Sequence, residues 1–102
     1  MALRNKLLAL GFERRQVGMT EFKPFYTTGF AKKLESLDNS VKQLAGKKIQ
    51  KILDNPFAGK PLHGEPFLFN ERFADSKYRI VYKIDGGFVR FIRIGKRDEV
   101  YR

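Results

Sequence analysis

The second half of the chain carries a regular alternation of apolar and polar residues, and this pattern restricts the fold more than any other feature. From residue 78 to residue 84 every second side chain is aromatic or branched, and two cations stand between them. The two interleaved sets are Tyr78, Ile80, Tyr82 and Ile84, and Arg79, Val81 and Lys83. A period of two is typical of a β-strand that buries one face. If the apolar set is buried, Arg79 points outward.

Two further strands are expected beside this one. Asp85-Gly86-Gly87 predicts a hairpin, because glycine readily takes the positive φ that a type I′ turn needs, and the strand after it runs over Phe88–Ile94. Ala74–Lys77 is expected to be a turn that leads back to an earlier strand with the same period. The aromatic residues that alternate along that strand are Phe67, Phe69 and Phe73. We expect them in the core rather than stacked on nucleic-acid bases.

The first half of the chain changes to a helical period. Residues 30–37 carry apolar side chains at helical spacing, and Thr28 is the expected N-cap. The apolar face consists of Phe30, Leu34 and Leu37. Before this helix, Phe22–Tyr26 predicts a short strand. Pro24 lacks the N–H that a central strand must donate, so the strand belongs at an edge of the sheet.

A second helix is expected after Asp38-Asn39, which ends the first. Ser40-Val41-Lys42-Gln43 fits a capping box, and Asn55-Pro56 stops the helix because the residue before proline avoids the α region. Phe57–Pro66, rich in glycine and proline, then forms a loop. The apolar stripe of the helix consists of Val41, Leu44, Ala45, Ile49, Ile52 and Leu53. Four lysines lie largely outside that stripe: Lys42, Lys47, Lys48 and Lys51. They form either a solvated face or a face that attracts phosphate.

The expected order is therefore β-α-α-β-β-β. This is an α+β fold in which two antiparallel helices pack on one face of a small, twisted, mainly antiparallel sheet. The fold occupies residues 21–102. Residues 1–20 form a separate basic extension, helical or disordered, in which Leu3, Leu7 and Leu10 have helical spacing. The extension is either an appendage or a functional arm.

The charge balance narrows the range of partners. The chain has 21 Lys and Arg against 11 Asp and Glu, a net charge of +10, and such a surface attracts polyanions. There is no cysteine, which excludes disulfides and thiolate nucleophiles. His63 is the single histidine and lies in a loop, where it is either an exposed residue or a general acid or base. No apolar run approaches the ~20 residues of a membrane span, so we expect a cytoplasmic protein.

Arginines occur inside the predicted strands, where charge is unusual. Arg72, Arg79 and Arg93 fall in strand patterns, and Arg97 shares the parity of Arg93. A row of guanidinium groups on a rigid sheet suits phosphate, because the planar fork binds two phosphate oxygens at once. The alternative is a solvated face that acids such as Glu71 balance. The excess of positive charge favours nucleic acid.

Four runs of sequence, taken in this order along the predicted elements, resemble the RelE/ParE superfamily of toxins. They are Leu53-Asp54-Asn55-Pro56, Gly59-Lys60-Pro61-Leu62-His63-Gly64, Tyr78-Arg79-Ile80-Val81-Tyr82-Lys83-Ile84-Asp85 and Ile94-Gly95-Lys96-Arg97-Asp98-Glu99-Val100-Tyr101. The ending is similar to the RelE branch, whose members cut messenger RNA in the ribosomal decoding site. ParE-type relatives instead poison DNA gyrase.

The resemblance implies a ribosome-dependent endoribonuclease that a cognate antitoxin holds inactive. Its partners are then messenger RNA and the decoding site of the small ribosomal subunit. Arg79, Arg97 and Tyr101 match the family's catalytic positions, and Arg72 and Asn70 fall where the family has basic residues. The residues expected to bind RNA are Arg72, Asn70, Arg93, Lys96, Lys48 and Lys51.

The chemistry of RNA cleavage fits these residue types. RNA carries its own nucleophile, the 2′-hydroxyl, so no metal or cofactor is expected. Arginine does not give up its proton, which leaves Arg72, Arg79 and Arg97 to hold the phosphate and stabilise its charge. Tyr101 is the candidate for proton transfer, and as a base near neutrality it needs a pKa below its usual value of about 10. Two alternatives stay open: a ParE-like toxin that inhibits gyrase by binding it, and a catalytically inactive basic RNA-binding domain.

Overall fold

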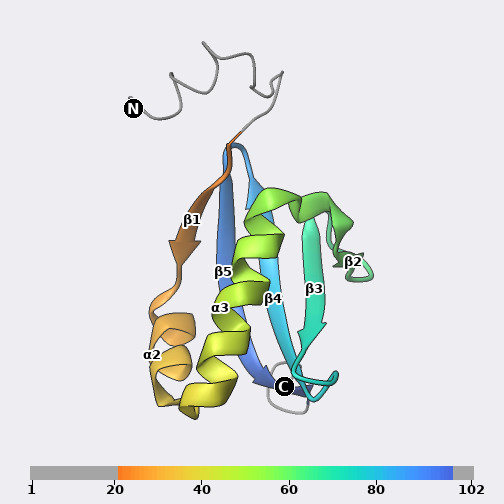
Figure 1. The fold of residues 1–102 in the computed structure, drawn as a ribbon. Helices are drawn as coiled ribbons and strands as arrows, with labels where there is room; N and C mark the ends of the chain where they lie inside the picture. The colour runs from red at the N-terminus through yellow and green to blue at the C-terminus, as the bar shows by residue number, and fades with distance from the viewer. Residues whose placement is uncertain (1–20, 98–102) are drawn as a thin grey trace, which may run out of the picture.

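The structure is a computed structural model and describes residues 21–97. The basic extension expected over 1–20, and Tyr101, lie outside the described residues. The elements (Figure 1) are β1 (Lys23–Tyr26), α2 (Thr28–Ser36), α3 (Asn39–Asp54), the 3-10 turn η1 (Pro56–Ala58), β2 (Lys60–Pro61), β3 (Leu68–Phe73), β4 (Tyr78–Asp85) and β5 (Phe88–Lys96).

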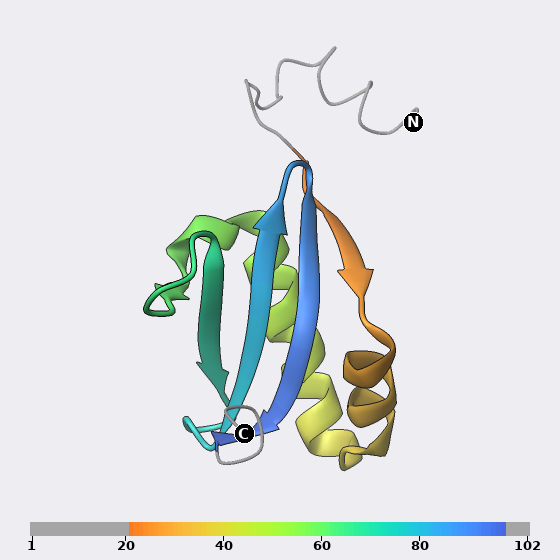
Figure 2. The ribbon, with the colours of Figure 1, turned by 180° about the vertical axis from the view of Figure 1, so that it is seen from behind.

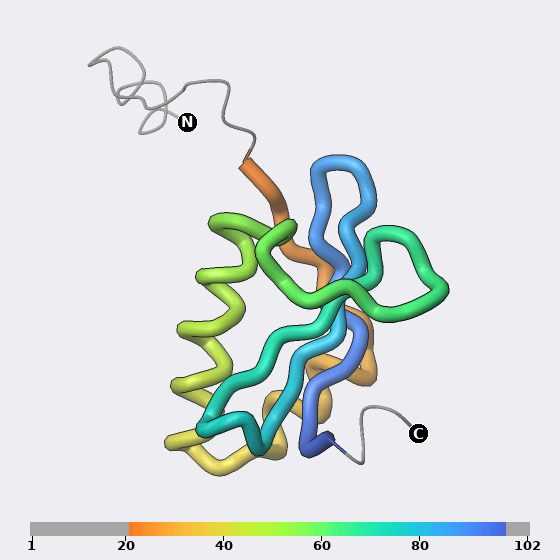
Figure 3. Tube along the Cα trace, turned by 90° about the vertical axis from the view of Figure 1, so that its right-hand side faces the viewer, coloured from red at the N-terminus to blue at the C-terminus, as the bar shows by residue number. Residues whose placement is uncertain are grey.

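The strands form one mixed sheet in the order β1-β5-β4-β3-β2. β1 runs parallel to β5, whereas the other neighbouring pairs are antiparallel. Helix α3 crosses one face of the sheet (Figures 1 and 3), and from behind no helix covers the strands (Figure 2). The predicted α+β fold is confirmed, with one short strand added. None of the helices among residues 21–97 is long and apolar enough to cross a membrane.

The core lies between the helices and the covered face of the sheet. Its buried members are Phe30, Ala45, Ile49, Ile52, Phe69, Phe73, Ile80, Tyr82, Ile84, Val89, Phe91 and Ile94. Phe91 is fully buried at its centre, and its ring lies 5.2 Å from that of Tyr26 and 5.5 Å from that of Phe30. The β4 alternation is confirmed, because Ile80, Tyr82 and Ile84 all belong to this core.

Tyr82 ties the segment after α3 to the sheet. Its hydroxyl donates a hydrogen bond to the Pro56 carbonyl at 2.7 Å, and its ring stacks on Phe69 at 5.5 Å. Burial raises the pKa of the Tyr82 phenol above its ordinary value, so the group stays neutral. A Cβ at Gly59 would overlap the Tyr82 hydroxyl, which explains why glycine occupies that position.

Helix α2 begins one residue earlier than expected. The N-cap is Thr27 rather than Thr28: its Oγ1 accepts the Phe30 N–H at 3.1 Å and donates to the Ile92 carbonyl of β5 at 3.1 Å. Thr27 therefore caps the helix and fastens it to the sheet. Phe30 is buried and Leu34 and Leu37 pack against the core, as predicted.

Two expectations for helix α3 are wrong. Ser40 does not open a capping box, because the helix already starts at Asn39 and its N-cap, Asp38, makes no side-chain capping bond. Leu44, placed in the apolar stripe, is 43% exposed, since the helix presents Ala45 and Ile49 to the sheet instead. The predicted stop at Asn55-Pro56 is confirmed.

The segment between α3 and β3 differs most from expectation. Within the predicted loop, Lys60–Pro61 pairs with Asn70 and Phe69 to form β2. Phe67 is not a core residue: its φ is +63° and the residue is 57% exposed, because the strand begins only at Leu68. The predicted turn at residues 74–77 is confirmed.

The β4–β5 hairpin forms at the expected place with a different turn. Of the two central residues only Gly86 has a positive φ, +60°, which is the pattern of a type II′ turn rather than the predicted type I′. The last strand also runs two residues further than predicted, to Lys96. Both edge strands are short and carry a proline, Pro24 or Pro61, which limits pairing with another chain.

Candidate functional site

The uncovered face of the sheet is basic. Because the alternate residues of β3, β4 and β5 fill the core, the residues between them point to this open face. The cations on it are Arg72, Arg79, Lys83, Arg90 and Arg93. Asp85 is the acid of β4 on the same face, and Glu65, in the loop before β3, reaches Lys83 at 3.8 Å. Positive charge therefore exceeds negative charge across this open face.

Arg79 and Arg72 lie directly opposite each other in the β3–β4 ladder. Side chains in such positions have Cβ atoms about 5 Å apart, and like charges placed there destabilise a sheet. On its other side Arg79 pairs with Gly95, which has no side chain. The Arg79 Nη1 is buried and has no hydrogen-bond partner in the described part of the chain. A buried guanidinium nitrogen without an acceptor is suited to an anion.

Arg93 owes its place beside this pair to a β-bulge. By simple alternation Arg93 would point the same way as the buried Phe91. The register shifts between Val81 and Tyr82, which leaves Ile92 as the extra residue and sets Arg93 opposite Val81. Arg93 is consequently exposed on the open face. Its cross-strand partner, Val81, is the next open-face residue of β4 after Arg79.

Arg97 extends the cluster at the same end of the sheet. It follows β5 directly, two residues after Gly95, the partner of Arg79, and it is exposed. We call Arg72, Arg79, Arg93 and Arg97 the arginine cluster. The third predicted catalytic residue, Tyr101, lies outside residues 21–97, so its position relative to Arg79 stays a prediction.

The other predicted RNA-binding residues lie elsewhere. Lys48 and Lys51 belong to α3, across the sheet from the arginine cluster, and Lys48 pairs with Glu71 on the covered face at 3.4 Å. Lys96 pairs with Tyr78, whose side chain packs against the core. Asn70 does lie among the open-face positions, but it is 8% exposed and its Nδ2 donates to the Lys60 carbonyl at 3.3 Å. Its amide therefore holds β2 in place.

Sequence reasoning missed two cations of the open face. Lys83 shares the alternation of Arg79, and Arg90 stands between the buried Val89 and Phe91, so the period of two was the available signal. Arg90 also lies over the exposed ring of Phe25 at 5.3 Å. That contact joins β1 to β5 and was not foreseeable, because the parallel pairing of these strands brings distant parts of the chain together.

Acid–base and metal-binding groups are sparse around the cluster. His63 is an exposed residue of the turn after β2, outside the strands that carry the arginines. Among residues 21–97 no group of three or more His, Cys, Asp or Glu side chains lies close enough to hold a metal ion. The arginine cluster can thus bind and neutralise an anion, and the described residues next to it do not supply a proton carrier.

Comparison with known proteins assigns the chain to a family. The model of the ParE toxin of type II toxin–antitoxin systems (parDE) matches residues 25–101. The chain belongs to this family, within the RelE/ParE toxin superfamily. It is therefore a toxin of a type II toxin–antitoxin system. No curated protein sequence matches it significantly.

Solved structures of this superfamily share the fold. The isolated Escherichia coli RelE toxin is 31% identical, with 78% of this chain and 90% of that chain covered and a TM-score of 0.66. A chain of the RelBE2 toxin–antitoxin complex from Mycobacterium tuberculosis is 25% identical, with 76% of this chain and 99% of that chain covered and a TM-score of 0.63. The ParDE system of P. aeruginosa matches at 11% identity, covering 76% and 98%, with a TM-score of 0.65, which shows the fold alone.

Proposed function

We propose that this toxin is an endoribonuclease that cuts messenger RNA in the decoding site of the small ribosomal subunit, in the cytoplasm. The observation that carries the proposal is the pair Arg72 and Arg79, opposite each other on the face of the sheet that no described helix covers, with the Arg79 Nη1 buried and without an acceptor among the described residues. A bridging phosphate would relieve the repulsion and satisfy that nitrogen. The 31% identity to E. coli RelE supports the same conclusion.

The proposed reaction uses the substrate's own nucleophile. The 2′-oxygen forms a bond to the adjacent phosphorus, and the bond from phosphorus to the 5′-oxygen breaks, which leaves a 2′,3′-cyclic phosphate and a free 5′-hydroxyl. A base takes the proton of the 2′-hydroxyl, and an acid gives one to the departing 5′-oxygen. Arg79, Arg72 and Arg97 stabilise the negative charge that builds up on the phosphorane oxygens.

Tyr101 is the proposed proton carrier. Arginine stays protonated at all accessible pH values, so the arginine cluster itself does not act as a base. The strands hold the phosphate-binding groups rigidly, and the ribosome supplies the geometry of the RNA. Arg93 and Asn70 are proposed to contact the RNA on the open face. Lys48, Lys51 and Lys96 are proposed to attract the polyanion at longer range.

A cognate antitoxin is the expected partner in the absence of the ribosome. The similar solved structures include RelBE toxin–antitoxin complexes. A basic toxin of net charge +10 attracts an acidic partner, and we propose that such an antitoxin inhibits the toxin when the two are made together.

A second candidate function is inhibition of DNA gyrase by binding. The observation that favours it is the family model itself, which describes the ParE toxin. Under this alternative the open face would contact a protein, and the toxin would cut no RNA. Replication would then stop before translation.

Primer extension on messenger RNA after induction tests the proposal. We expect cuts at a fixed position in codons of translated messages with the wild-type toxin. We expect none with Arg79→Ala, and unchanged cuts with Lys47→Ala, which removes an exposed cation from α3. Growth arrest without cuts, with replication failing first, would overturn the proposal in favour of gyrase inhibition.

A further inference from the structure

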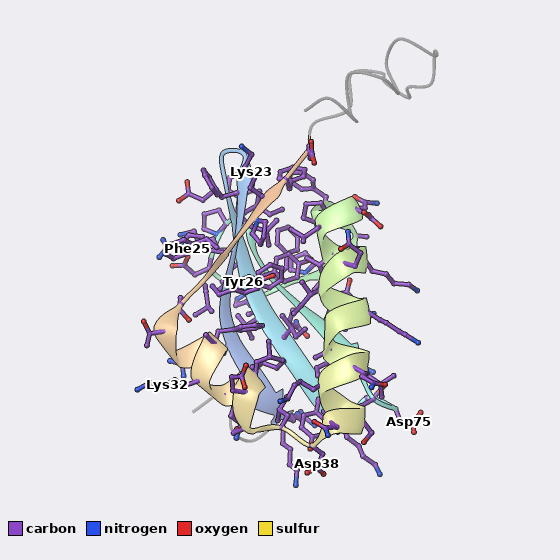
Figure 4. The ribbon with its side chains drawn as sticks, turned by 60° about the vertical axis from the view of Figure 1, so that its left-hand side comes forward. Lys23, Phe25, Tyr26, Lys32, Asp38 and Asp75 are labelled. Atoms are coloured by element: carbon purple, nitrogen blue, oxygen red, sulfur yellow. The ribbon has the colours of Figure 1, made fainter. Side chains whose placement is uncertain are left out.

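A shallow hollow lies on the open face near the β4–β5 hairpin, away from the arginine cluster. It has a volume of about 270 Å³ and is lined by Phe25, Asp85, Phe88 and Arg90. Phe25 comes from β1 and the other residues from β4 and β5, so the parallel β1–β5 pairing creates the hollow. Figure 4 shows Phe25 and Tyr26 on opposite sides of β1, and Tyr26 packs against the core ring of Phe91.

The two phenylalanines of the hollow are unusually exposed for such large apolar side chains. Phe25 is 49% and Phe88 48% exposed, and neither belongs to the core. The Arg90 guanidinium lies 5.3 Å from the centre of the Phe25 ring, in the position of a cation–π contact. Flat rings beside a cation on an open sheet are the arrangement that other proteins use to stack unpaired bases of single-stranded RNA.

Asp85 adds a hydrogen-bond acceptor to this surface. It pairs with Phe88 across the hairpin, and its carboxylate takes part in no ion pair among the described residues. A carboxylate accepts hydrogen bonds from the amino group of a base, as it does from cytosine N4. Guanine offers two adjacent N–H groups, at N1 and N2, whereas uracil has no amino group. The same carboxylate disfavours an acidic peptide in the hollow.

The hollow and the arginine cluster lie along one line of the sheet. Arg90 pairs with Lys83, and Arg79 lies four residues before Lys83 on β4. At about 3.3 Å per residue this gives roughly 13 Å between the two positions, a span that a few nucleotides of extended RNA can bridge. Arg93, opposite Val81, stands between them, and Lys83 lies beside Arg90 at the end nearer the hollow; both can accompany the phosphates.

We propose that the hollow binds one unpaired nucleobase of an RNA strand whose backbone runs over the open face, with guanine preferred and uracil disfavoured. The inference rests on the proposed function for its substrate class and adds the subsite that selects a base. The base stacks on Phe88 and Phe25, Arg90 holds its phosphate, and Asp85 accepts its N–H groups.

Fluorescence anisotropy with short RNA probes tests the subsite without requiring cleavage. The probes are a fluorescein-labelled nonamer of uridine, the same nonamer with a central guanosine, and a third with a central inosine, which keeps N1–H but lacks the 2-amino group. We expect the wild-type chain to bind the guanosine probe about tenfold tighter than the uridine probe. Inosine should fall between them.

Three variants separate the roles of the lining residues. Asp85→Asn should reduce the guanosine preference to less than threefold while the uridine probe binds at least as well. Phe88→Leu should weaken binding of the guanosine probe about tenfold, because a stacking surface is lost. Phe88→Tyr keeps an aromatic ring and should bind the guanosine probe about as tightly as wild type. Thermal melting of each variant shows that the fold is retained.

The outcomes distinguish this inference from the proposed function. Equal affinity for all three probes, or unchanged binding by Phe88→Leu and Asp85→Asn, would overturn the subsite. Base selection with no cutting of ribosome-bound message would support the subsite and overturn the nuclease proposal. Cutting of ribosome-bound message with no base selection would support the nuclease proposal and overturn the subsite.

Discussion

The two faces of the same sheet differ in how completely their groups are satisfied. On the covered face, aromatic and branched side chains fill the core, the Tyr82 hydroxyl reaches a carbonyl and Glu71 has Lys48 beside it. On the open face, Arg72 lies opposite Arg79 and the Arg79 Nη1 has no acceptor within residues 21–97. Adjacent residues of one strand thus lie on opposite faces and have different roles. The covered face stabilises the fold, and the open face carries an excess of positive charge.

The largest effect on stability is expected from Phe91, at the centre of the covered face. Phe91→Ala should lower the free energy of unfolding by about 3–5 kcal/mol, because it leaves a cavity among packed rings. Arg93→Ala, two residues away on the open face, should change it by no more than about 0.5 kcal/mol. Urea denaturation of both variants measures the contrast. A comparable loss in Arg93→Ala would show that the open face also supports the fold.

Tyr82→Phe should have the next largest effect, about 1–3 kcal/mol, because it leaves the Pro56 carbonyl without its donor. The difference in stability between wild type and Tyr82→Phe also depends on pH. The Tyr82 pKa is raised in the folded state, so above about pH 10 the unfolded chain loses the phenol proton while the folded chain keeps it. The unfolded state then binds fewer protons, and stability falls as the pH rises. Between pH 9 and 11 wild type should lose more stability than Tyr82→Phe; parallel losses would contradict the assignment.

Arg72→Ala should show that the like-charged pair lowers the stability of the fold but strengthens the binding of RNA. Removing one of two opposed cations should stabilise the fold by about 0.2–1 kcal/mol. The same change should weaken binding of a uridine nonamer and reduce the slope of log affinity against log salt by about 0.7, the value for one phosphate contact to a single strand. Lys51→Ala on α3 should change the slope less. An equal change for Lys51 would mean that RNA also runs over the helices.

The smallest effect is expected at the ion pair on the covered face. Lys48 and Glu71 are 3.4 Å apart, with side chains 23% and 24% exposed, so solvent still screens them. Lys48→Ala should destabilise the fold by about 0.5–1 kcal/mol, and the neighbouring Lys47→Ala by less than that. Thermal denaturation distinguishes the two. Full retention of stability in Lys48→Ala would show that the pair is incidental.

Much of the open face was predictable because it depends on local periodicity. The β4 alternation places Arg79 outward, and the arrangement of β3 beside it needs only a turn at residues 74–77. The order of strands and helices follows in the same way from a helical period in the first half and a period of two in the second. Helix caps were less predictable, because Thr27 is selected over Thr28 by its bond to Ile92, a residue 65 positions away.

The remaining features depend on contacts between distant parts of the chain. The bulge at Ile92 sets Arg93 on the open face although simple alternation points it inward. Strand β2 is two residues long and carries a proline, so no periodicity marks it. The hollow needs β1 beside β5, and the lack of an acceptor for the Arg79 Nη1 among residues 21–97 is a property of packing rather than of sequence.

The most direct test of the arginine cluster is the single-turnover rate at which the purified chain cuts messenger RNA on programmed ribosomes. We expect Arg79→Ala to lower this rate about 10²–10³-fold, the usual loss on removing one donor to a developing oxyanion, while Lys47→Ala cuts at the wild-type rate. Message with a 2′-deoxy nucleotide at the cut should stay intact. Equal rates for wild type and a folded Arg79→Ala would contradict the role given to the open face.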